Sequence, residues 1–353
     1  MRMNPNNPLG RRSGAGRNPV IKNMPQSGQN HDVVPLTWKF VNHLDTGLRR
    51  HDVVFANGQS GMNPTLRNIL HHNSQRLEAA LDLDSSSARI EAQCLLQAAL
   101  QVNRAYLLTH PEQQLDSEQQ ARYIMLLERR LGGEPIAYIL GEREFYGLNF
   151  KVTPNTLIPR PDTELLVELA LQRIPQRSAF RVLDMGTGSG AIALSIAHAR
   201  PDAEVMAVDA SRDALNVADE NAQRLKLGNV RLLHSDWFST LPGERFDLIV
   251  SNPPYIAATD THLTQGDLRF EPCSALISGM GGLDDIRRII ADAKAHLNEE
   301  GWLLLEHGYD QAEQVRALLR QAGFSEVFSA RDLAGIERVT GGSSGRRIVA
   351  QAA

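Results

Sequence analysis

Cysteine is almost absent from this sequence, which has only Cys94 and Cys273 among its 353 residues. Disulfide frameworks and zinc sites need several suitably spaced cysteines or histidines, and these two lie far apart without a second pair. The histidines are scattered and form no ligand pattern. We therefore expect no disulfide and no metal site, and interpret both cysteines as buried or unused thiols.

Long apolar runs are also absent. No stretch approaches the roughly 20 consecutive apolar residues that a membrane-spanning helix needs. Arginines near the start, from Arg2 to Arg17, are not followed by an apolar segment, so no ordinary secretory signal peptide is predicted. The content of 42% hydrophobic and 22% charged residues is typical of a globular protein. We expect a cytoplasmic protein with no membrane partner.

Excess positive charge is missing from most of the chain. Residues 1–62 hold eight of the 37 Lys and Arg residues and three of the 41 Asp and Glu residues, which leaves 29 basic against 38 acidic residues. Proteins that grip a phosphate backbone neutralise many phosphates with basic side chains. The acidic body therefore argues against a direct nucleic-acid target.

Residues 1–62 are rich in Asn, Gly, Pro, Arg and Ser and show no sustained apolar period. This composition predicts a disordered basic extension. Two interpretations of its role remain open. It is either a tether for RNA or the ribosome, or a dispensable extension, which includes the case in which Met62 is the true start.

The next segment, residues 63–140, has the apolar period of helices. Leucine and isoleucine recur about every 3.6 residues between Leu66 and Leu81, and Ser85–Ser87 offers caps for a helix through Ala99. Asp116 precedes a third helical pattern. We predict a small helical bundle.

A hairpin and a linker are predicted for residues 141–161. Gly132–Pro135 ends the third helix, and Phe145–Val152 has the pattern of two short strands with a turn near Gly147. The proline-containing stretch that follows is expected to be extended. These residues therefore join the bundle to the remainder of the chain.

Residues 162–353 alternate between helix and strand patterns, after a helix that begins around Asp162–Glu164. Such alternation predicts an α/β domain with a mainly parallel, seven-stranded sheet covered by helices on both faces. The expected strands are Arg181–Asp184, Ala203–Asp209, Val230–His234, Phe246–Ser251, Gly301–His307, Ser325–Ala330 and Arg347–Gln351.

A glycine-rich turn, Gly186-Thr187-Gly188-Ser189-Gly190, follows the first of these strands. Glycines let a backbone approach a ligand closely, and doubly wound sheets bind ligands at the carboxyl ends of their strands. Asp209 ends the next strand, where a carboxylate can accept both hydroxyls of an adenosine ribose. The pair predicts a nucleoside-containing cofactor, although a tight turn without a ligand and a nicotinamide site share parts of the pattern. Asp184 favours a cationic amino-acid headgroup over a pyrophosphate.

Ser235-Asp236-Trp237-Phe238 follows the third strand. Trp237 is a candidate to pack against an adenine ring, and core packing is the alternative. For Phe238 we expect core packing. Two later segments are open in the same way: Glu306-His307-Gly308 either borders the pocket or packs at a strand end, and Asp267–Pro272 is either a lid or a surface loop.

The sharpest feature is Asn252-Pro253-Pro254-Tyr255, which follows the apolar strand Asp247–Ser251. The prolines stiffen the backbone and cannot continue a ladder, so carbonyl groups point outward. The Asn252 side-chain oxygen and the Pro253 carbonyl can accept the two hydrogens of a planar NH2 group, and Tyr255 can pack on its flat face. Such an arrangement predicts methyl transfer to an amide-like nitrogen by positioning, without a metal.

From about Gln75 to Ala350 the chain resembles the PrmC, or HemK, family of release factor glutamine methyltransferases. The segments that carry the resemblance are Gly133–Tyr138, Arg143–Gly147, Thr156–Glu164, Asp184–Gly190, Ser251–Ile256, Asp267–Pro272, Leu304–Gly308 and Glu337–Val339. The family has no counterpart to residues 1–62.

This resemblance implies a Rossmann-like class I methyltransferase fold and S-adenosyl-L-methionine as cofactor. It implies that Gly186–Gly190, Asp209, Trp237 and Asn252 contact the cofactor, and that Asn252–Tyr255 holds the substrate glutamine. The implied substrate is the Gln of the Gly-Gly-Gln motif of class 1 peptide chain release factors, which dock on the helical N-terminal domain.

The tetrapeptide alone does not choose this substrate, because enzymes that methylate adenine in DNA or guanine in ribosomal RNA share it. The hairpin and Ile158–Glu164 favour a protein glutamine. The alternatives are a methyltransferase for a ribosomal-protein glutamine or a nucleic-acid base amine, an inactive cofactor-binding adaptor of translation, and a dehydrogenase.

Overall fold

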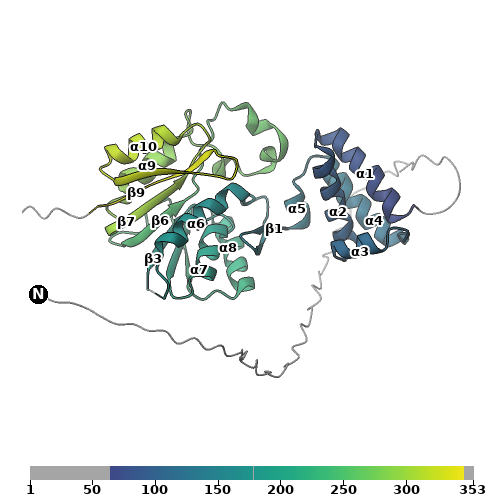
Figure 1. Ribbon diagram of the computed structural model, residues 1–353, viewed down its shortest axis with the longest axis horizontal. Helices are drawn as coiled ribbons and strands as arrows, with labels where there is room; N and C mark the ends of the chain where they lie inside the picture. The colour runs from purple at the N-terminus through teal and green to yellow at the C-terminus, as the bar shows by residue number, and fades with distance from the viewer. Residues whose placement is uncertain (1–63, 178, 346–353) are drawn as a thin grey trace, which may run out of the picture. The chain divides into compact units, whose positions relative to one another are not determined.

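The computed structural model describes residues 64–177 and 179–345 (Figure 1). The predicted disordered extension, residues 1–62, and the strand expected at Arg347–Gln351 lie outside the described residues. No helix of the described part is long and apolar enough to cross a membrane.

The predicted helical bundle is confirmed, with two additional short helices. Leucines from its helices form one buried core. Asp84, rather than one of the serines after it, is the N-cap of α2 and accepts the backbone N–H groups of Ser86 and Ser87. Asp116 closes a capping box with Gln119 at the start of α4. The helices are α1 (Leu66–Leu81), α2 (Ser85–Leu100), α3 (Arg104–Thr109), α4 (Ser117–Leu131) and α5 (Ile136–Leu140).

The hairpin is confirmed as β1 (Glu142–Phe145) and β2 (Leu148–Lys151), an antiparallel pair with a two-residue turn. Tyr146 and Gly147 both have positive φ, of 50° and 73°, as the twist of a two-residue hairpin requires. Lys151 anchors the hairpin, because its backbone N–H donates to Asn221 Oδ1 at 2.7 Å and its carbonyl accepts Asn221 Nδ2 at 3.0 Å.

The seven-stranded sheet has the order β5-β4-β3-β6-β7-β9-β8. The neighbours from β5 to β7 run parallel, and β9 is antiparallel to both β7 and β8. The strands are β3 (Arg181–Met185), β4 (Glu204–Asp209), β5 (Val230–His234), β6 (Phe246–Ser251), β7 (Leu297–Glu306), β8 (Ser325–Arg331) and β9 (Glu337–Ser343).

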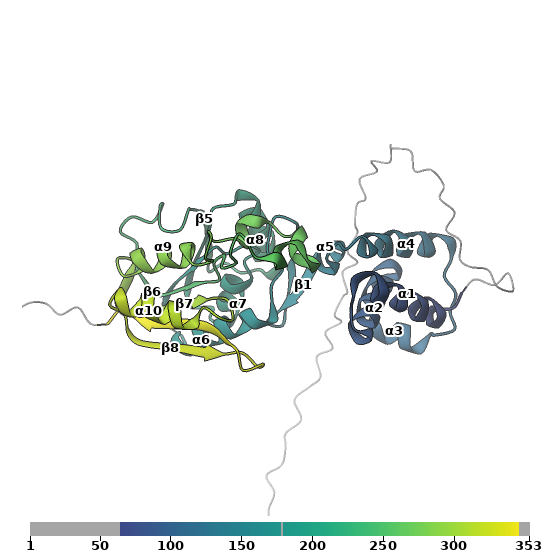
Figure 2. The same cartoon turned by 90° about the horizontal axis from the view of Figure 1, so that it is seen from above.

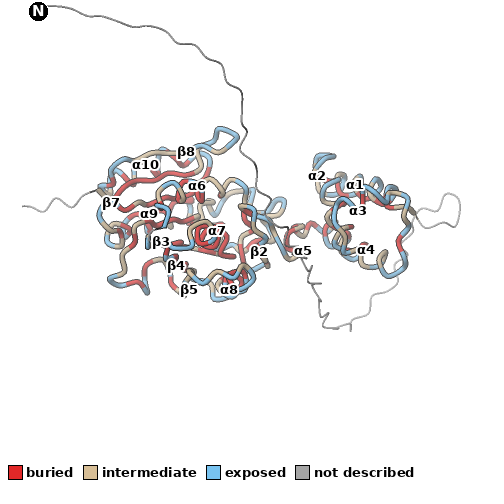
Figure 3. The backbone as a smooth tube through the Cα atoms, turned by 60° about the horizontal axis from the view of Figure 1, so that its bottom comes forward, coloured by how far each residue is buried: buried red, intermediate tan, exposed pale blue. Residues whose placement is uncertain are grey.

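Helices cover both faces of this sheet (Figures 1 and 2). Side chains alternate along each strand, so Val182 of β3 packs with α6 and α7 in one buried cluster, and Leu183 packs with α9 and α10 in the other. The strands β3 and β6 in the middle of the sheet and helix α7 are among the most deeply buried parts (Figure 3). The helices are α6 (Glu164–Arg173), α7 (Ala191–Ala199), α8 (Arg212–Leu225), α9 (Asp284–Ala293) and α10 (Ala312–Gln321).

One strand of the sheet, β9 (Glu337–Ser343), was not among the expected strands. A Cβ atom on Gly341 would lie 2.5 Å from Leu304 Cδ2 and 2.8 Å from the Leu303 carbonyl oxygen, so β9 needs a glycine to approach β7. β7 also begins at Leu297, four residues before the expected start at Gly301.

Candidate active site

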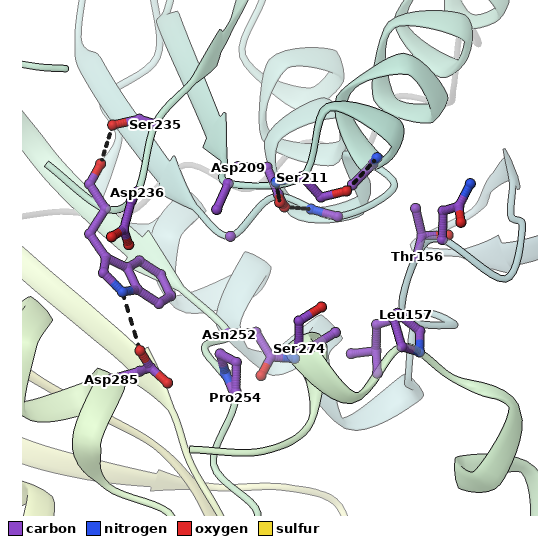
Figure 4. Close-up of a pocket in the computed structure, with 18 of the residues that line it drawn as sticks. Thr156, Leu157, Asp209, Ser211, Ser235, Asp236, Asn252, Pro254, Ser274 and Asp285 are labelled. Atoms are coloured by element: carbon purple, nitrogen blue, oxygen red, sulfur yellow. Dashed lines mark hydrogen bonds between the residues drawn. The ribbon is translucent and has the colours of Figure 1, made fainter. Parts of the chain in front are cut away.

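A pocket of about 360 Å³ opens at the carboxyl ends of β3, β4, β5 and β6 (Figure 4). The strand order reverses between β3 and β6, which is where doubly wound sheets place their ligands. Six of the predicted site residues line it: Gly186, Gly188, Asp209, Trp237, Asn252 and Pro254.

The glycine-rich turn is clamped onto β4. The backbone N–H groups of Gly186 and Thr187 donate to the Val208 carbonyl at 2.9 and 3.0 Å. Gly186 and Gly188 have φ values of 70° and 56°, a conformation that favours glycine. Because neither carries a Cβ atom, the backbone itself forms this wall of the pocket.

Three predicted cofactor contacts support the turn from behind and do not line the pocket. Thr187 donates its hydroxyl to Asp184 Oδ2 at 2.6 Å. The Ser189 carbonyl accepts Asn221 Nδ2 at 2.9 Å, which connects the turn to the hairpin anchor. Gly190 is the N-cap of α7, and a Cβ atom there would lie 2.9 Å from Leu194 Cδ1.

Asp184 does not face the pocket as we expected for a partner of a cationic headgroup. It is fully buried, and its Oδ2 accepts the Thr187 hydroxyl and the Ala193 backbone N–H at 2.6 and 3.2 Å. Among the described residues Oδ1 has no hydrogen-bond partner. Burial raises the pKa of this carboxyl to about 7. Asp184 therefore braces the turn from below.

Asp209 is held so that both of its oxygens keep a free lone pair. Oδ2 accepts the Gly188 backbone N–H at 2.8 Å, and Oδ1 accepts that of Ser211 at 2.8 Å. Burial raises the pKa of Asp209, and hydrogen bonds from backbone N–H groups, chiefly those of Ser211 and Gly188, act against that effect. The carboxyl group lines the pocket with fixed orientation, as a group that binds a vicinal diol requires (Figure 4).

Trp237 forms a second wall of the pocket, next to the glycine-rich turn. Its φ is 49°, its Nε1 donates to Asp285 Oδ1 at 3.2 Å, and its ring lies 3.5 Å from the position that a Cβ atom of Gly186 would take. The ring is thereby fixed next to the turn, where it offers an apolar surface to a flat ring. Phe238 packs in the core and stacks on His296, as expected.

Asn252 lies directly after β6 and lines the pocket. Its Nδ2 donates to Thr163 Oγ1 at 3.2 Å, whereas its Oδ1 accepts no hydrogen bond from the described residues. Pro254 also lines the pocket, and Pro253 is buried. Asn252 Oδ1 is therefore free to accept a hydrogen bond from a molecule bound in the pocket, which Asp209 also lines.

Tyr255 is positioned next to this pocket but does not form its wall. Its hydroxyl donates to Glu306 Oε1 at 3.4 Å, and its carbonyl accepts Gln311 Nε2 at 3.0 Å. Burial raises the pKa of the Tyr255 hydroxyl above its ordinary value. Gln311 also donates to the Gly282 carbonyl at 3.3 Å, so one side chain holds two loops together.

The segment Asp267–Pro272 is more than a free surface loop. Glu271 is buried, accepts the Ile158 backbone N–H at 3.1 Å and pairs with Arg160. Pro272 lines the pocket. No cluster suited to hold a metal ion occurs among residues 64–177 and 179–345.

Thr163, Gln311 and Asn221 were missed as site residues when the sequence was considered alone. Thr163 stands inside the Pro-Asp-Thr-Glu segment, which gave a weak signal. Gln311 and Asn221 contact the site across 56 and 32 positions, and nothing local in the sequence marks them.

Comparisons with known proteins agree with this geometry. Residues 68–141 match the family model "PrmC N-terminal domain", and residues 162–271 match "Methyltransferase small domain". The release factor glutamine methyltransferase of Salmonella typhimurium is 52% identical, covering 73% of this chain and 93% of the relative. The enzymes of the same name from Bordetella pertussis and Escherichia coli are 55% and 50% identical, and the matches cover 96% and 92% of those relatives.

Proposed function

Because this chain belongs to the family of release factor glutamine methyltransferases, we propose that it transfers a methyl group from S-adenosyl-L-methionine to a glutamine of a class 1 peptide chain release factor. The atom methylated is the side-chain amide nitrogen, in the Gly-Gly-Gln motif of the factor. The observation that supports this role best is Asn252, whose amide nitrogen is anchored while its oxygen is left free at the pocket.

The residues of the pocket fit the cofactor. A volume of about 360 Å³ lies within the range of small-molecule sites. Asp209 would accept the two ribose hydroxyls with its free lone pairs, Trp237 would pack on the adenine, and the backbone of Gly186 and Gly188 would face the amino-acid part, with Thr187, Ser189 and Gly190 supporting the turn from behind. When bound, S-adenosyl-L-methionine supplies a methyl group on a positively charged sulfur.

The tetrapeptide prepares the substrate nitrogen. An amide nitrogen is a poor nucleophile, because its lone pair is delocalised into the carbonyl group. Asn252 Oδ1 and the Pro253 carbonyl accept its two N–H groups, which raises its electron density and fixes its direction. Pro254 and Tyr255 complete the substrate site, with the Tyr255 ring on the flat face of the amide. Transfer would replace one N–H of the amide by N–CH3, with the sulfur–carbon bond broken, S-adenosyl-L-homocysteine as leaving group and one proton released from the nitrogen to solvent. The rate gain comes mainly from position.

The segments of the chain have separate tasks in this proposal. Residues 63–140 form the domain on which the release factor docks, residues 141–161 join it to the catalytic domain, and residues 162–353 carry the reaction. The protein works in the cytoplasm, where translation termination takes place. No nucleic acid and no membrane take part as direct partners.

A labelling experiment tests the proposal. The full chain is incubated with S-adenosyl-L-methionine carrying a labelled methyl group and either a purified release factor, ribosomal RNA or DNA. Label on the release factor glutamine is expected, and label on nucleic acid alone would contradict the proposal. Asn252→Ala should lower the rate about 100-fold or more, as loss of one preorganised polar group does in other active sites. Asn216→Ala, at an exposed position of α8, is the matched control and should be unchanged.

A further inference from the structure

A buried carboxyl group lies beside the tetrapeptide and has no place in the mechanism above. Glu306 ends β7, which pairs with β6 so that Ser251 stands opposite Leu305. Asn252 and Glu306 are the next residues, so they leave the sheet side by side. Glu306 is only 2% exposed, and its Oε2 has no hydrogen-bond partner within the described ranges.

Burying a carboxyl group of which one oxygen has no hydrogen-bond partner lowers the stability of the folded protein. A glutamine or an apolar residue would end the strand at lower cost. Glu306 Oε1 accepts the Tyr255 hydroxyl, which connects the carboxyl group to one end of the tetrapeptide.

The other end of the tetrapeptide is connected through Thr163. The Thr163 hydroxyl accepts Asn252 Nδ2 at 3.2 Å. The Thr163 hydroxyl also lowers the pKa of the neighbouring Glu306 carboxyl group. A hydroxyl has a single proton, so when that proton is directed at Glu306, only lone pairs remain for Asn252. The Asn252 amide must then present its nitrogen to Thr163 and its oxygen to the pocket.

We propose that Glu306 is a positioning residue for methyl transfer, which in its ionised form fixes Tyr255 directly and the Asn252 amide through Thr163. This inference rests on the proposed function and adds a residue to it. The direction of the chain is Asn252 Nδ2 to Thr163 Oγ1 to Glu306. If Glu306 holds a proton, it no longer requires the Thr163 proton, and the opposite orientation of the Asn252 amide becomes accessible.

The charges around Glu306 set the pH at which this happens. Burial is the largest effect and raises the pKa of Glu306 to about 7. Arg338 lowers it and Asp162 raises it, and these two side chains pair with each other at 3.3 Å. The Tyr255 hydroxyl lowers it by its hydrogen bond. We therefore expect kcat to fall as the pH falls through about 7.

Glu306→Gln in the full chain is the first test. The replacement keeps the shape of the side chain and removes its charge. We expect kcat for release factor methylation to fall at least 10-fold, KM for S-adenosyl-L-methionine to change less than 3-fold, and the fall of kcat near pH 7 to disappear. Wild-type kcat with an unchanged pH profile would overturn the inference.

Thr163 provides the matched pair of variants, which also keeps the inference testable if Glu306→Gln fails to fold. Thr163→Ser keeps the hydroxyl and should retain kcat within 3-fold, whereas Thr163→Val removes it and should lose at least 10-fold. Equal loss in both variants would contradict the role of the hydroxyl. Failure of the proposed function would look different, because the wild-type protein itself would then leave the release factor glutamine unmethylated.

Discussion

Replacing Asp209 by Asn isolates the predicted contact with the cofactor ribose. Both carboxyl oxygens already accept a backbone N–H group at 2.8 Å, from Gly188 and from Ser211. The Asn side chain has one oxygen and one NH2 group in place of the two carboxyl oxygens. The NH2 group cannot accept a hydrogen bond, so one of these two backbone N–H groups and one ribose hydroxyl lose their acceptor. A hydrogen bond to a charged group is worth about 1.5–3 kcal/mol. The dissociation constant for S-adenosyl-L-methionine should therefore rise about 10–100-fold.

Isothermal titration calorimetry of the purified protein measures this change. Asp202→Asn, which removes the same charge from an exposed loop, is the matched control and should bind as the wild type does. A cofactor analogue without ribose hydroxyls should bind the wild type and Asp209→Asn with similar affinity. Binding of S-adenosyl-L-methionine to Asp209→Asn within 2-fold of the wild type would refute the assigned contact.

Three further predictions concern stability and are measured by urea unfolding. Gly282→Ala should lower the free energy of unfolding by about 2 kcal/mol or more, because φ is 71° and the new Cβ atom would lie 2.3 Å from the Tyr255 carbonyl oxygen. The control is Gly281→Ala, whose Cβ atom would meet nothing within 4 Å and which should change the free energy little; equal effects would contradict the prediction. Arg130→Met should lower the free energy of unfolding by about 3–5 kcal/mol, because removing the guanidinium group, which is 5% exposed, leaves its carboxylate partner on α2 unpaired. An unchanged free energy of unfolding would contradict this prediction. Burial raises the pKa of Asp184 from 3.8 to about 7, so between these pH values the folded state holds the proton and the unfolded state does not. The free energy of unfolding should therefore fall as the pH rises from about 4 to about 7, and Asp184→Asn should make this dependence flatter. An unchanged slope in the variant would contradict the prediction.

The sheet and the position of the pocket could be predicted from the sequence because their signals are local. β6 contains the apolar run Leu248–Val250 and is followed, after Asn252, by two prolines, and β5 is bounded by polar residues, so both have the expected bounds. β9 could not be found in this way. Gly341 and Gly342 weaken any strand pattern in the sequence. These positions need glycine because Leu304 and Phe324 approach the backbone of β9 closely.

The candidate site shows the same division. Asn252 and Asp209 could be predicted because Asn252 follows a buried strand and Asp209 is the last residue of another. The partner that orients Asn252 is Thr163, 89 positions earlier, and a sequence does not show which hydroxyl a distant amide meets. Asp184 was misjudged for the related reason that the turn after β3 folds its Thr187 hydroxyl back onto the carboxyl group.

A mass spectrum of the release factor peptide that contains the Gly-Gly-Gln motif tests the central claim most directly. The factor is purified from cells that lack this protein, incubated with the full chain and S-adenosyl-L-methionine, and digested with trypsin. We predict one added methyl group, assigned by fragmentation to the side chain of the glutamine, and no addition when the protein is omitted. An unmodified glutamine after incubation with protein that binds the cofactor would contradict the account.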